Sequence, residues 1–451
     1  MGGGIRRILS TGTGRSLGRT VSSAEPAEIE EEVRPGLRAA VAAFRYRNFA
    51  LFWTGALVSN TGGWVQNVTV PYVIFQLTDS AAWVGFASFS LLITASILGP
   101  VGGTLADRFD RRAVLLVMST AQAGVAMGLW LMWSAGVRSP GAIVALAATS
   151  GVFAGLMIGS WQAFVSELVP REALLNAVTL NSAQFNAARA FGPAIGGIVL
   201  ALVGPGWAFF INGVSFLAVI GALLAMRLDR VVAKAVGRMR IVADFRETIR
   251  YVRASPGIST CVVVVAALGF FEAPVFQLVV VFAEDVFLVD TWVFGVLSAA
   301  LGIGAILGTP FVAGWGGEFR RQALVGGAIL LTGTSMTLFA LAPNAYVGFV
   351  GLLGVGAGYL AIASSLNTTI QLQVDERMRG KVLAFYVLGI TLCAPIGSLV
   401  QGAMAEIIGP RATVATAGVA FVGVLVLLRA RGSLAHLDDE VPTPLLDGAA
   451  D

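Results

Sequence analysis

From Phe49 to Arg429 the chain is a succession of long apolar runs separated by short polar breaks. Each run is close to the ~20 residues that an α-helix needs to cross a bilayer, and each is longer than an ordinary strand. The pattern therefore predicts an all-α membrane protein with twelve transmembrane helices. The predicted spans are 49–76, 82–105, 113–134, 140–164, 177–203, 206–227, 257–283, 291–314, 322–342, 346–369, 382–408 and 411–429.

The break at residues 228–256, between the sixth and seventh runs, is longer than the others and has its own pattern. Apolar residues recur there every three or four positions with Arg and Glu between them, which is the spacing of an amphipathic helix. We expect this helix to lie on the membrane surface and to connect two halves of the chain. A helix that binds a regulatory partner would show the same pattern. Its apolar positions are Val232, Val236, Met239, Val242, Phe245, Ile249 and Val252.

An internal repeat supports the division into halves. When the chain is shifted by 205 residues, segment 151–214 meets segment 356–419 without a gap, and the identities fall mainly on Gly and Pro, which constrain backbone geometry. The matches are Gly151/Gly356, Ser160/Ser365, Val169/Val374, Gly192/Gly397, Gly197/Gly402, Gly204/Gly409, Pro205/Pro410, Gly213/Gly418 and Val214/Val419. The expected organisation is a disordered cytoplasmic tail (1–45), a six-helix bundle (46–227), the connector (228–256), a second six-helix bundle (257–430) and a cytoplasmic tail (431–451).

The composition fits a lipid environment and narrows the function. Hydrophobic residues make up 56% of the chain and charged residues 12%, with a mean hydropathy of +0.81, whereas soluble domains carry about 25% charged residues. Cys261 and Cys393 fall inside predicted spans without a metal-binding spacing, and His436 is the only histidine. No Gly-rich phosphate-binding loop ending in Gly-Lys-Ser/Thr occurs. We therefore expect no enzyme, no ATP-driven pump, and neither cofactor nor metal.

The basic residues are distributed unevenly over the predicted loops. With both termini on one side, all but three of the 30 Lys and Arg lie on that side. Arg138 and Arg411 fall on the other side, and Arg189 falls within a span. Because basic loops face the cytoplasm, we expect a monomeric, multi-pass protein of the inner (plasma) membrane with cytoplasmic termini. The loops then face anionic lipid headgroups, so the pI of 9.4 implies no nucleic-acid partner.

The predicted loop between the second and third spans reads Gly-Thr-Leu-Ala-Asp-Arg-Phe-Asp-Arg-Arg from Gly103 to Arg112. It resembles the signature of the major facilitator superfamily, which at this place has a Gly, an Asp-Arg pair and a basic pair. We expect Gly103 to let helices approach and Asp107 to accept hydrogen bonds from Arg111 or a helix N-terminus. Such contacts would latch the halves closed on the cytoplasmic side. The signature residues are Gly103, Asp107, Arg108, Arg111 and Arg112; the second-half counterpart, 314–321, lacks the Asp.

The fifth span contains Gly-Pro-Ala-Ile-Gly-Gly from Gly192 to Gly197. This run, with Gly192, Pro193, Gly196 and Gly197, resembles the GPxxGG antiporter signature of exporters in the superfamily. Ala188 stands where the full pattern has Gly. A general helix-packing motif remains the alternative, because small residues allow close helix contacts in lipid.

Two further stretches, 48–80 and 106–112, resemble the enterobactin-exporter-type branch of the superfamily, and this likeness extends over about residues 45–430. The branch includes drug and siderophore efflux permeases. The resemblance implies export of small amphipathic molecules, with protons as the exchanged partner. The fourth span, around Thr149, lacks the Arg that drug:proton antiporters carry there. An uptake permease and a non-transporting sensor are the alternatives.

In the major facilitator fold the first, fourth, seventh and tenth spans line a central cavity. The resemblance therefore implies that polar and aromatic residues of these spans contact the substrate. The candidates are Asn60, Trp64, Asn67, Trp161, Gln162, Phe271, Phe276, Gln277, Tyr359 and Asn367. Aromatic rings mixed with a few amides suit a broad amphipathic ligand. Trp161 fits equally well as an anchor at the membrane interface.

Two charged residues lie near the middle of predicted spans, Glu272 and Arg189. A charge near the bilayer centre costs at least about 2.5–3.5 kcal/mol on insertion scales, and such residues usually serve a function. Glu272 can bind and release a proton or bind a cationic substrate, and Pro274 close by predicts a broken helix. A structural ion pair is the alternative. Arg189 fits an anionic substrate or a carboxylate partner equally well.

Overall fold

The computed structural model describes residues 41–227, 241–315 and 319–439, which belong to one compact unit. These ranges are mostly helical and contain no strand. Most of the predicted tails 1–45 and 431–451 lie outside the described residues. So do the connector positions Val232, Val236 and Met239, and the side chain of Val242.

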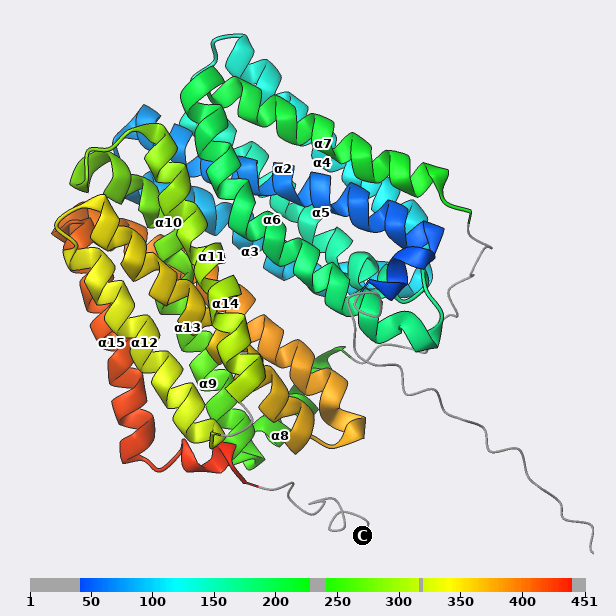
Figure 1. Ribbon diagram of the computed structural model, residues 1–451, viewed down its shortest axis with the longest axis vertical. Coiled ribbons are helices and arrows are strands. Elements are labelled where there is room, and N and C mark those ends of the chain that lie inside the picture. Colours follow the sequence, from blue (N-terminus) through cyan, green and yellow to red (C-terminus); the bar gives the residue numbers. More distant parts are fainter. Residues whose placement is uncertain (1–40, 228–240, 316–318, 440–451) are drawn as a thin grey trace, which may run out of the picture. The chain divides into compact units, whose positions relative to one another are not determined.

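The first half of the fold consists of six long helices and two short ones (Figure 1). They are η1 (Ala42–Arg45), α2 (Arg47–Thr78), α3 (Ala81–Arg108), α4 (Arg111–Ser134), α5 (Pro140–Val165), η2 (Arg171–Ala173), α6 (Leu174–Val203) and α7 (Pro205–Ala225). The second half follows the connector. It comprises α8 (Ile241–Ala254), α9 (Pro256–Phe271), α10 (Ala273–Val281), the π-helical η3 (Phe282–Val286), α11 (Thr291–Trp315), α12 (Arg321–Leu341), α13 (Ala345–Gln373), α14 (Glu376–Ile408), α15 (Pro410–Ala430) and η4 (Ala435–Leu437).

Eleven stretches of the described residues are long and apolar enough to cross a membrane, and α9, α10 and η3 together form one of them. Helix α2 is not among the eleven, because Ser59, Asn60, Gln66 and Asn67 lower its hydropathy. It nevertheless has 32 residues and packs against α6 and α7 inside the first half. With α2 included, the predicted all-α fold of twelve spans in two halves is confirmed.

The internal repeat of the sequence is visible as repeated backbone geometry. Gly204 (φ +83°) and Gly409 (φ +86°) end α6 and α14, and the proline that follows each begins the next helix. These positive φ angles favour glycine over other residues. A Cβ on Gly151 or Gly356 would lie about as close to the backbone of the neighbouring helix, 2.1 Å from Leu91 O and 1.9 Å from Leu301 O. The halves are therefore related by a pseudo-twofold arrangement.

The most extensive contacts between the halves are made by two pairs of helices, α6 with α11 and α3 with α14. Each pair crosses at glycine. A Cβ on Gly197 would lie 2.4 Å from the Cα of Gly295, and a Cβ on Gly402 would lie 2.8 Å from the Cα of Gly85. Gly197 and Gly402 are repeat-related, so the same type of residue makes both crossings. Side chains larger than hydrogen cannot fit at such backbone contacts in lipid-embedded helices.

The helix ends lie on two opposite faces, which we name by a residue on each. The Glu406 end carries the α2–α3 and α14–α15 turns, and the Arg111 end carries the α3–α4 loop, α8 and residues 431–439. At the Glu406 end, Gln76 Nε2 donates to Glu284 (3.0 Å) and Ser80 Oγ donates to Glu406 Oε2 (2.9 Å). Both bonds cross between the halves, so the halves are tied together at this end.

At the Arg111 end, helix α8 and the C-terminal segment pack on the second half. Lys381 of α14 forms an ion pair with Glu247 of α8 (2.7 Å), and Phe245 packs on Phe385. The connector is thus helical in its described part, as predicted. Residues 431–439, at the start of the predicted tail, are folded against α9, α12 and α13, with Leu437 fully buried. In the first half, Ala43 N similarly donates to Asn176 Oδ1 (2.8 Å).

Candidate substrate and coupling site

An arginine surrounded by aromatic rings lies where the two halves face each other. The guanidinium of Arg189, on α6, lies over the ring of Tyr359 on α13 at 4.6 Å and over the ring of Trp64 on α2 at 6.0 Å. A cation at these distances is attracted by the electron-rich faces of the rings. Because α2 and α6 belong to the first half and α13 to the second, the cluster is assembled from both halves.

Trp64 is the centre of this aromatic cluster. Its ring meets Phe276 of α10 edge-on (centroids 5.5 Å apart) and Phe185 of α6 (6.3 Å), distances typical of attractive aromatic pairs. Phe185 was not a sequence candidate, because it lies in the fifth span, which the resemblance does not place at the cavity. Its position one helical turn before Arg189 is the signal that could have identified it.

The Gly-Pro run of α6 holds Trp64 in place. A Cβ on Gly192 would lie 2.4 Å from Trp64 Cβ, and a Cβ on Gly196 would lie 2.5 Å from Val68 Cγ2. Both glycines therefore let α6 lie against α2, while Gly197 faces α11 in the other half. Pro193, inside α6, has its carbonyl next to Gly295 of α11. The run thus combines packing of the aromatic site with packing between the halves.

The predicted break in the seventh span occurs at Glu272, where α9 ends and α10 begins. Pro274 has no N–H, so the carbonyl of Phe270 lacks its usual helical donor. The Nε2 of Gln401, on α14, replaces that donor with hydrogen bonds to Phe270 O (2.7 Å) and Phe271 O (3.1 Å). Gln401 was missed in the sequence, because its role depends on a carbonyl of a helix far away along the chain.

Glu272 is only 4% exposed, and within the described residues its carboxyl has neither a hydrogen bond nor an ion pair. Arg189 is the charged group that interacts with it electrostatically, at more than ion-pair distance. The ion pair that the sequence left open is therefore not formed in this conformation. Glu272 and Arg189 are therefore near enough to influence each other but are not paired.

The other predicted cavity residues divide into two groups. Asn60 and Gln277 each have a buried polar atom without a hydrogen-bond partner in the described chain, Nδ2 and Oε1 respectively, and Asn67 is half-buried. Phe271 instead packs against Phe270 and Phe421 in the second half. These two amide atoms of α2 and α10 are thus buried without a protein partner among the described residues.

The candidates of the fourth and tenth spans, Tyr359 excepted, have their described contacts outside the arginine cluster. Trp161 packs on Phe52, which also contacts Phe164 near the Arg111 end. Gln162 is exposed, and Asn367 accepts a hydrogen bond from Gln371, one turn further along α13. These three were predicted as one set with Trp64, but no described contact connects them with it.

The signature loop between α3 and α4 has contacts that differ from the expected ones. Arg111 Nη1 pairs with Glu167 (2.5 Å) after α5, and its Nε donates to Ala106 O (3.1 Å). The partner of Arg111 is thus Glu167 and not Asp107. Asp107 is half-buried and has no hydrogen bond in the described residues. These contacts of Arg111 stay within the first half, so in this conformation Arg111 does not connect the halves.

The remaining signature residues also show a shift of role. A Cβ on Gly103 would meet no atom within 4 Å, whereas one on Gly102 would lie 2.4 Å from Gly155 O. Both glycines lie where α3 approaches α5, because a Cβ on Gly159 of α5 would lie 2.8 Å from the Cα of Gly103. Arg112 Nη2 donates to Leu224 O at the end of α7 (3.3 Å), and Arg108 is exposed.

Several known proteins are similar to this chain in both sequence and fold. The transmembrane secretion effector model of the major facilitator superfamily matches residues 38–446. The enterobactin exporter EntS of Shigella boydii is 28% identical over 376 residues, covering 80% of this chain and 86% of that protein. The multidrug efflux pump Tap of Mycolicibacterium fortuitum is 23% identical over 366 residues, covering 79% and 89%.

A solved structure agrees with this relationship at the level of the fold. A mutant of the nucleoside transporter NupG superimposes with a TM-score of 0.69, covering 86% of this chain and 99% of that chain at 13% identity. The likeness covers both six-helix halves. The chain therefore belongs to the transmembrane secretion effector family of the major facilitator superfamily, and it is an integral membrane transporter and not an enzyme.

Proposed function

We propose that this protein exports small amphipathic organic molecules by alternating access, with proton antiport as the energy source. The observation that carries the proposal is the cluster of Arg189, Trp64 and Tyr359, which both halves build together. A ligand held there contacts α2, α6 and α13 at once, so its binding responds to movement of the halves. The names of EntS and Tap, an enterobactin exporter and a multidrug efflux pump, favour export as the direction.

The contacts between the halves support a specific place in the transport cycle. The Gln76–Glu284 and Ser80–Glu406 bonds close the Glu406 end, while Arg111 pairs within its own half. The basic loops gather at the Arg111 end, which we assign to the cytoplasm. In this assignment the conformation accepts substrate from the cytoplasm, and Asp107 is free to accept the latch contacts when that end closes.

Glu272 is the proposed coupling acid. It is buried next to the break between α9 and α10, and Arg189 is near enough to interact with its charge. A carboxyl in this position changes the local charge by one unit when it binds a proton. A cationic or dipolar substrate then competes with that proton for the same carboxylate, which is the requirement for antiport.

Two measurements test this proposal. Cells that lack or overproduce the protein are exposed to a panel of amphipathic compounds, and lower accumulation on overproduction is the expected result for substrates. Proteoliposomes with Glu272→Gln are then compared with wild type under a pH gradient. We expect loss of gradient-driven transport, and no such loss for Glu376→Gln, an exposed acid of α14. Unchanged transport by the Glu272 variant would exclude this residue as the coupling acid.

A further inference from the structure

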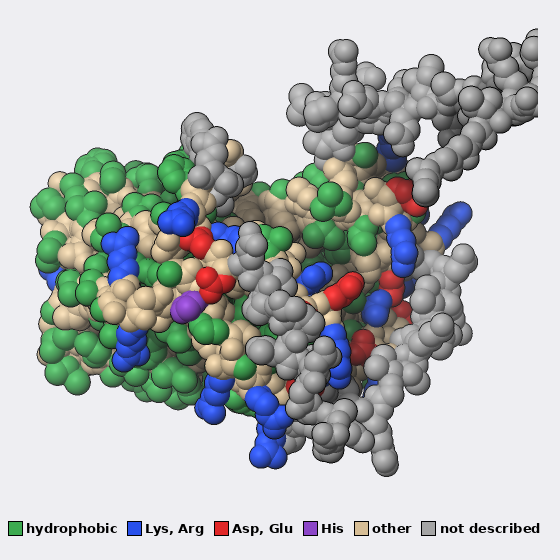
Figure 2. All heavy atoms as spheres, turned by 90° about the horizontal axis from the view of Figure 1, so that it is seen from below, with side chains coloured by type: hydrophobic (Ala, Val, Ile, Leu, Met, Phe, Trp, Pro, Cys, Tyr) green, Lys and Arg blue, Asp and Glu red, His purple; other side chains and the backbone are tan. Residues whose placement is uncertain are grey.

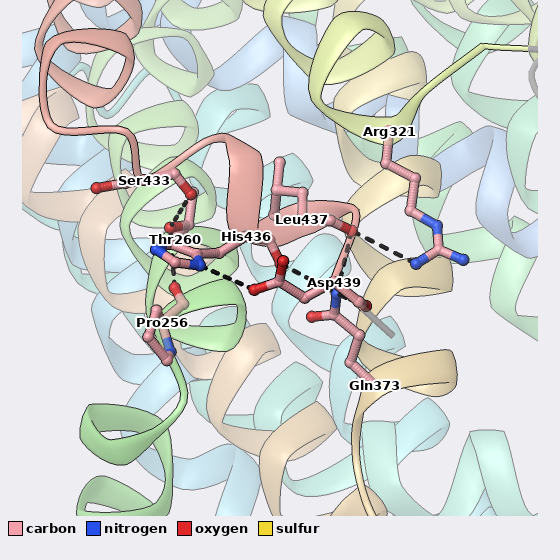
Figure 3. A network of polar contacts seen from close by, with 8 residues as sticks. All are labelled: Pro256, Thr260, Arg321, Gln373, Ser433, His436, Leu437 and Asp439. Carbon is pink, nitrogen blue, oxygen red and sulfur yellow. Dashed lines mark hydrogen bonds and ion pairs between the residues drawn. The ribbon is translucent and has the colours of Figure 1, made fainter. Parts of the chain in front are cut away.

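The C-terminal segment 431–439 forms one wall of a cavity at the Arg111 end of the second half. Gln373 Nε2, from α13, anchors the segment by donating to the carbonyls of His436 (3.1 Å), Leu437 (3.1 Å) and Asp439 (2.9 Å) (Figure 3). Thr260 of α9 donates to Ser433 O (3.1 Å). These bonds hold the segment across the ends of α9, α12 and α13, and a wall held in this way can bind a ligand.

The cavity lies between this segment, the beginning of α12 and the end of α15. Its volume is about 300 Å³, and it is lined by Gln322, Ala323, Arg429, Gly432, Leu434 and Ala435. Arg429 extends from α15 towards α12, where its Nη2 lies 3.5 Å from the position that a Cβ on Gly326 would occupy. Gly326 therefore leaves the space that the guanidinium and its ligand require.

Arg429 is the charged residue among those that line the cavity, and it has no ion pair in the described part of the chain. Two acids lie nearby. Asp438 Oδ1 accepts from Gln322 N (3.3 Å), while its Oδ2 has no hydrogen-bond partner among the described residues, and Asp439 pairs with His436 (2.8 Å). Figure 2 views this end, where the only histidine of the sequence, His436, lies beside acidic side chains, with Lys and Arg side chains around this group.

The depth of the cavity in the membrane indicates where its ligand comes from. The apolar spans of α12 and α15 are bounded by Arg321 and Ala430, so Gln322 and Arg429 lie at headgroup level. One turn deeper on α15, Val426 is 61% exposed, and two turns deeper on α12, Leu330 is 47% exposed. By helical spacing these apolar side chains lie on the same face of their helices as Arg429 and Gln322, where an acyl chain can lie against them.

We propose that this cavity binds the phosphate group of an anionic phospholipid, with Arg429 as the residue that contacts the phosphate. Basic pockets between transmembrane helices at the headgroup level recognise such lipids. A soluble phosphate offers the same charge but has no acyl chain to use the surface of Val426 and Leu330. The competing explanation for Arg429 is that its charge only stabilises the C-terminus of α15.

Thermal unfolding of the purified full-length protein in detergent distinguishes these explanations. Phosphatidylglycerol is titrated against phosphatidylcholine and against glycerol phosphate, with wild type, Arg429→Gln, Gly326→Leu and the control Arg431→Gln. We expect saturable stabilisation by phosphatidylglycerol alone, with the half-maximal concentration raised about fivefold by Arg429→Gln and unchanged by Arg431→Gln. Gly326→Leu, whose side chain would displace the guanidinium of Arg429 but keeps the arginine, should weaken the effect as well.

Three results would overturn the proposal. Equal stabilisation of Arg429→Gln and wild type by phosphatidylglycerol shows that Arg429 does not bind the lipid. A lower unfolding temperature of Arg429→Gln with an unchanged lipid response assigns the arginine to the helix C-terminus. Equal stabilisation by glycerol phosphate assigns the cavity to a soluble phosphate.

Discussion

Removing the Glu406 carboxylate should open the Glu406 end of the transporter. Glu406 Oε2 accepts hydrogen bonds from Ser80 Oγ (2.9 Å) and from Ala82 N (3.3 Å), both across the boundary between the halves. Glu406→Ala is preferred to a change of Ser80, because Ser80 also caps α3 by accepting from Trp83 N. The substitution therefore removes the contact between the halves and leaves the Ser80 cap of α3 in place.

The size of the effect follows from the exposure of the site. A hydrogen bond to a charged group contributes about 1.5–3 kcal/mol when buried, but water competes with these bonds because Glu406 is exposed. We therefore take about 1 kcal/mol for the pair, which changes the ratio of closed to open conformations about fivefold. The Gln76–Glu284 bond remains in the variant, so the Glu406 end should open in a fraction of the molecules and not in all of them.

Distances between spin labels at this end measure the change. Val137, after α4, and Tyr346, at the start of α13, are both exposed and lie in different halves. Labels on cysteines at these two positions, with Cys393→Ser to remove the partly accessible native thiol, should show a longer distance population that grows about fivefold in Glu406→Ala. The matched control is Asp290→Ala, an exposed acid at the same end without a described contact to the first half. Unchanged distances in Glu406→Ala, or equal changes in both variants, would show that Glu406 does not hold the halves together at this end.

Three further predictions concern packing and transport. Gly197→Leu should lower the unfolding temperature and abolish transport, because its side chain meets the Cα of Gly295, whereas Leu at Gly99, which has open space, should be tolerated in the same assays. Gln401→Leu should destabilise the protein by about 1–3 kcal/mol, since it leaves the Phe270 carbonyl buried without a donor; a denaturant or thermal unfolding curve identical to wild type would contradict this. Glu167→Gln should cost about 1 kcal/mol or less and leave transport intact, because the Arg111 pair is partly exposed and lies within one half; loss of transport would disprove this reading of the loop.

Much of the fold could be predicted from the sequence because its signals are local. A transmembrane span can be recognised from the length and hydropathy of an apolar run. The break at Glu272 follows from Pro274, whose nitrogen cannot donate a hydrogen bond. The internal repeat identified Gly197 and Gly402 as equivalent positions, although it did not reveal the glycines that they contact. The first span was predicted correctly even though its polar residues keep α2 outside the eleven apolar spans.

The site was harder to predict, because its members meet only through tertiary contacts. Arg189 was recognised as an intramembrane charge, but its aromatic partners Trp64 and Tyr359 lie on two other helices, far away along the chain. Trp161 has the composition of a cavity residue and packs on Phe52 instead. Residues 431–439 carry the polar composition of a tail, yet the three bonds from Gln373 hold them in place. No periodicity in the sequence encodes such contacts.

Export through a substrate site at Arg189 is tested most directly by substrate accumulation in energised inside-out membrane vesicles that contain wild type or Arg189→Ala. Wild-type vesicles should accumulate an amphipathic substrate and release it when a protonophore removes the gradient. Arg189→Ala vesicles, with the protein present in equal amount, should not accumulate it. Equal accumulation by both vesicle types would contradict a substrate site at Arg189, and wild-type accumulation only in right-side-out vesicles would contradict export.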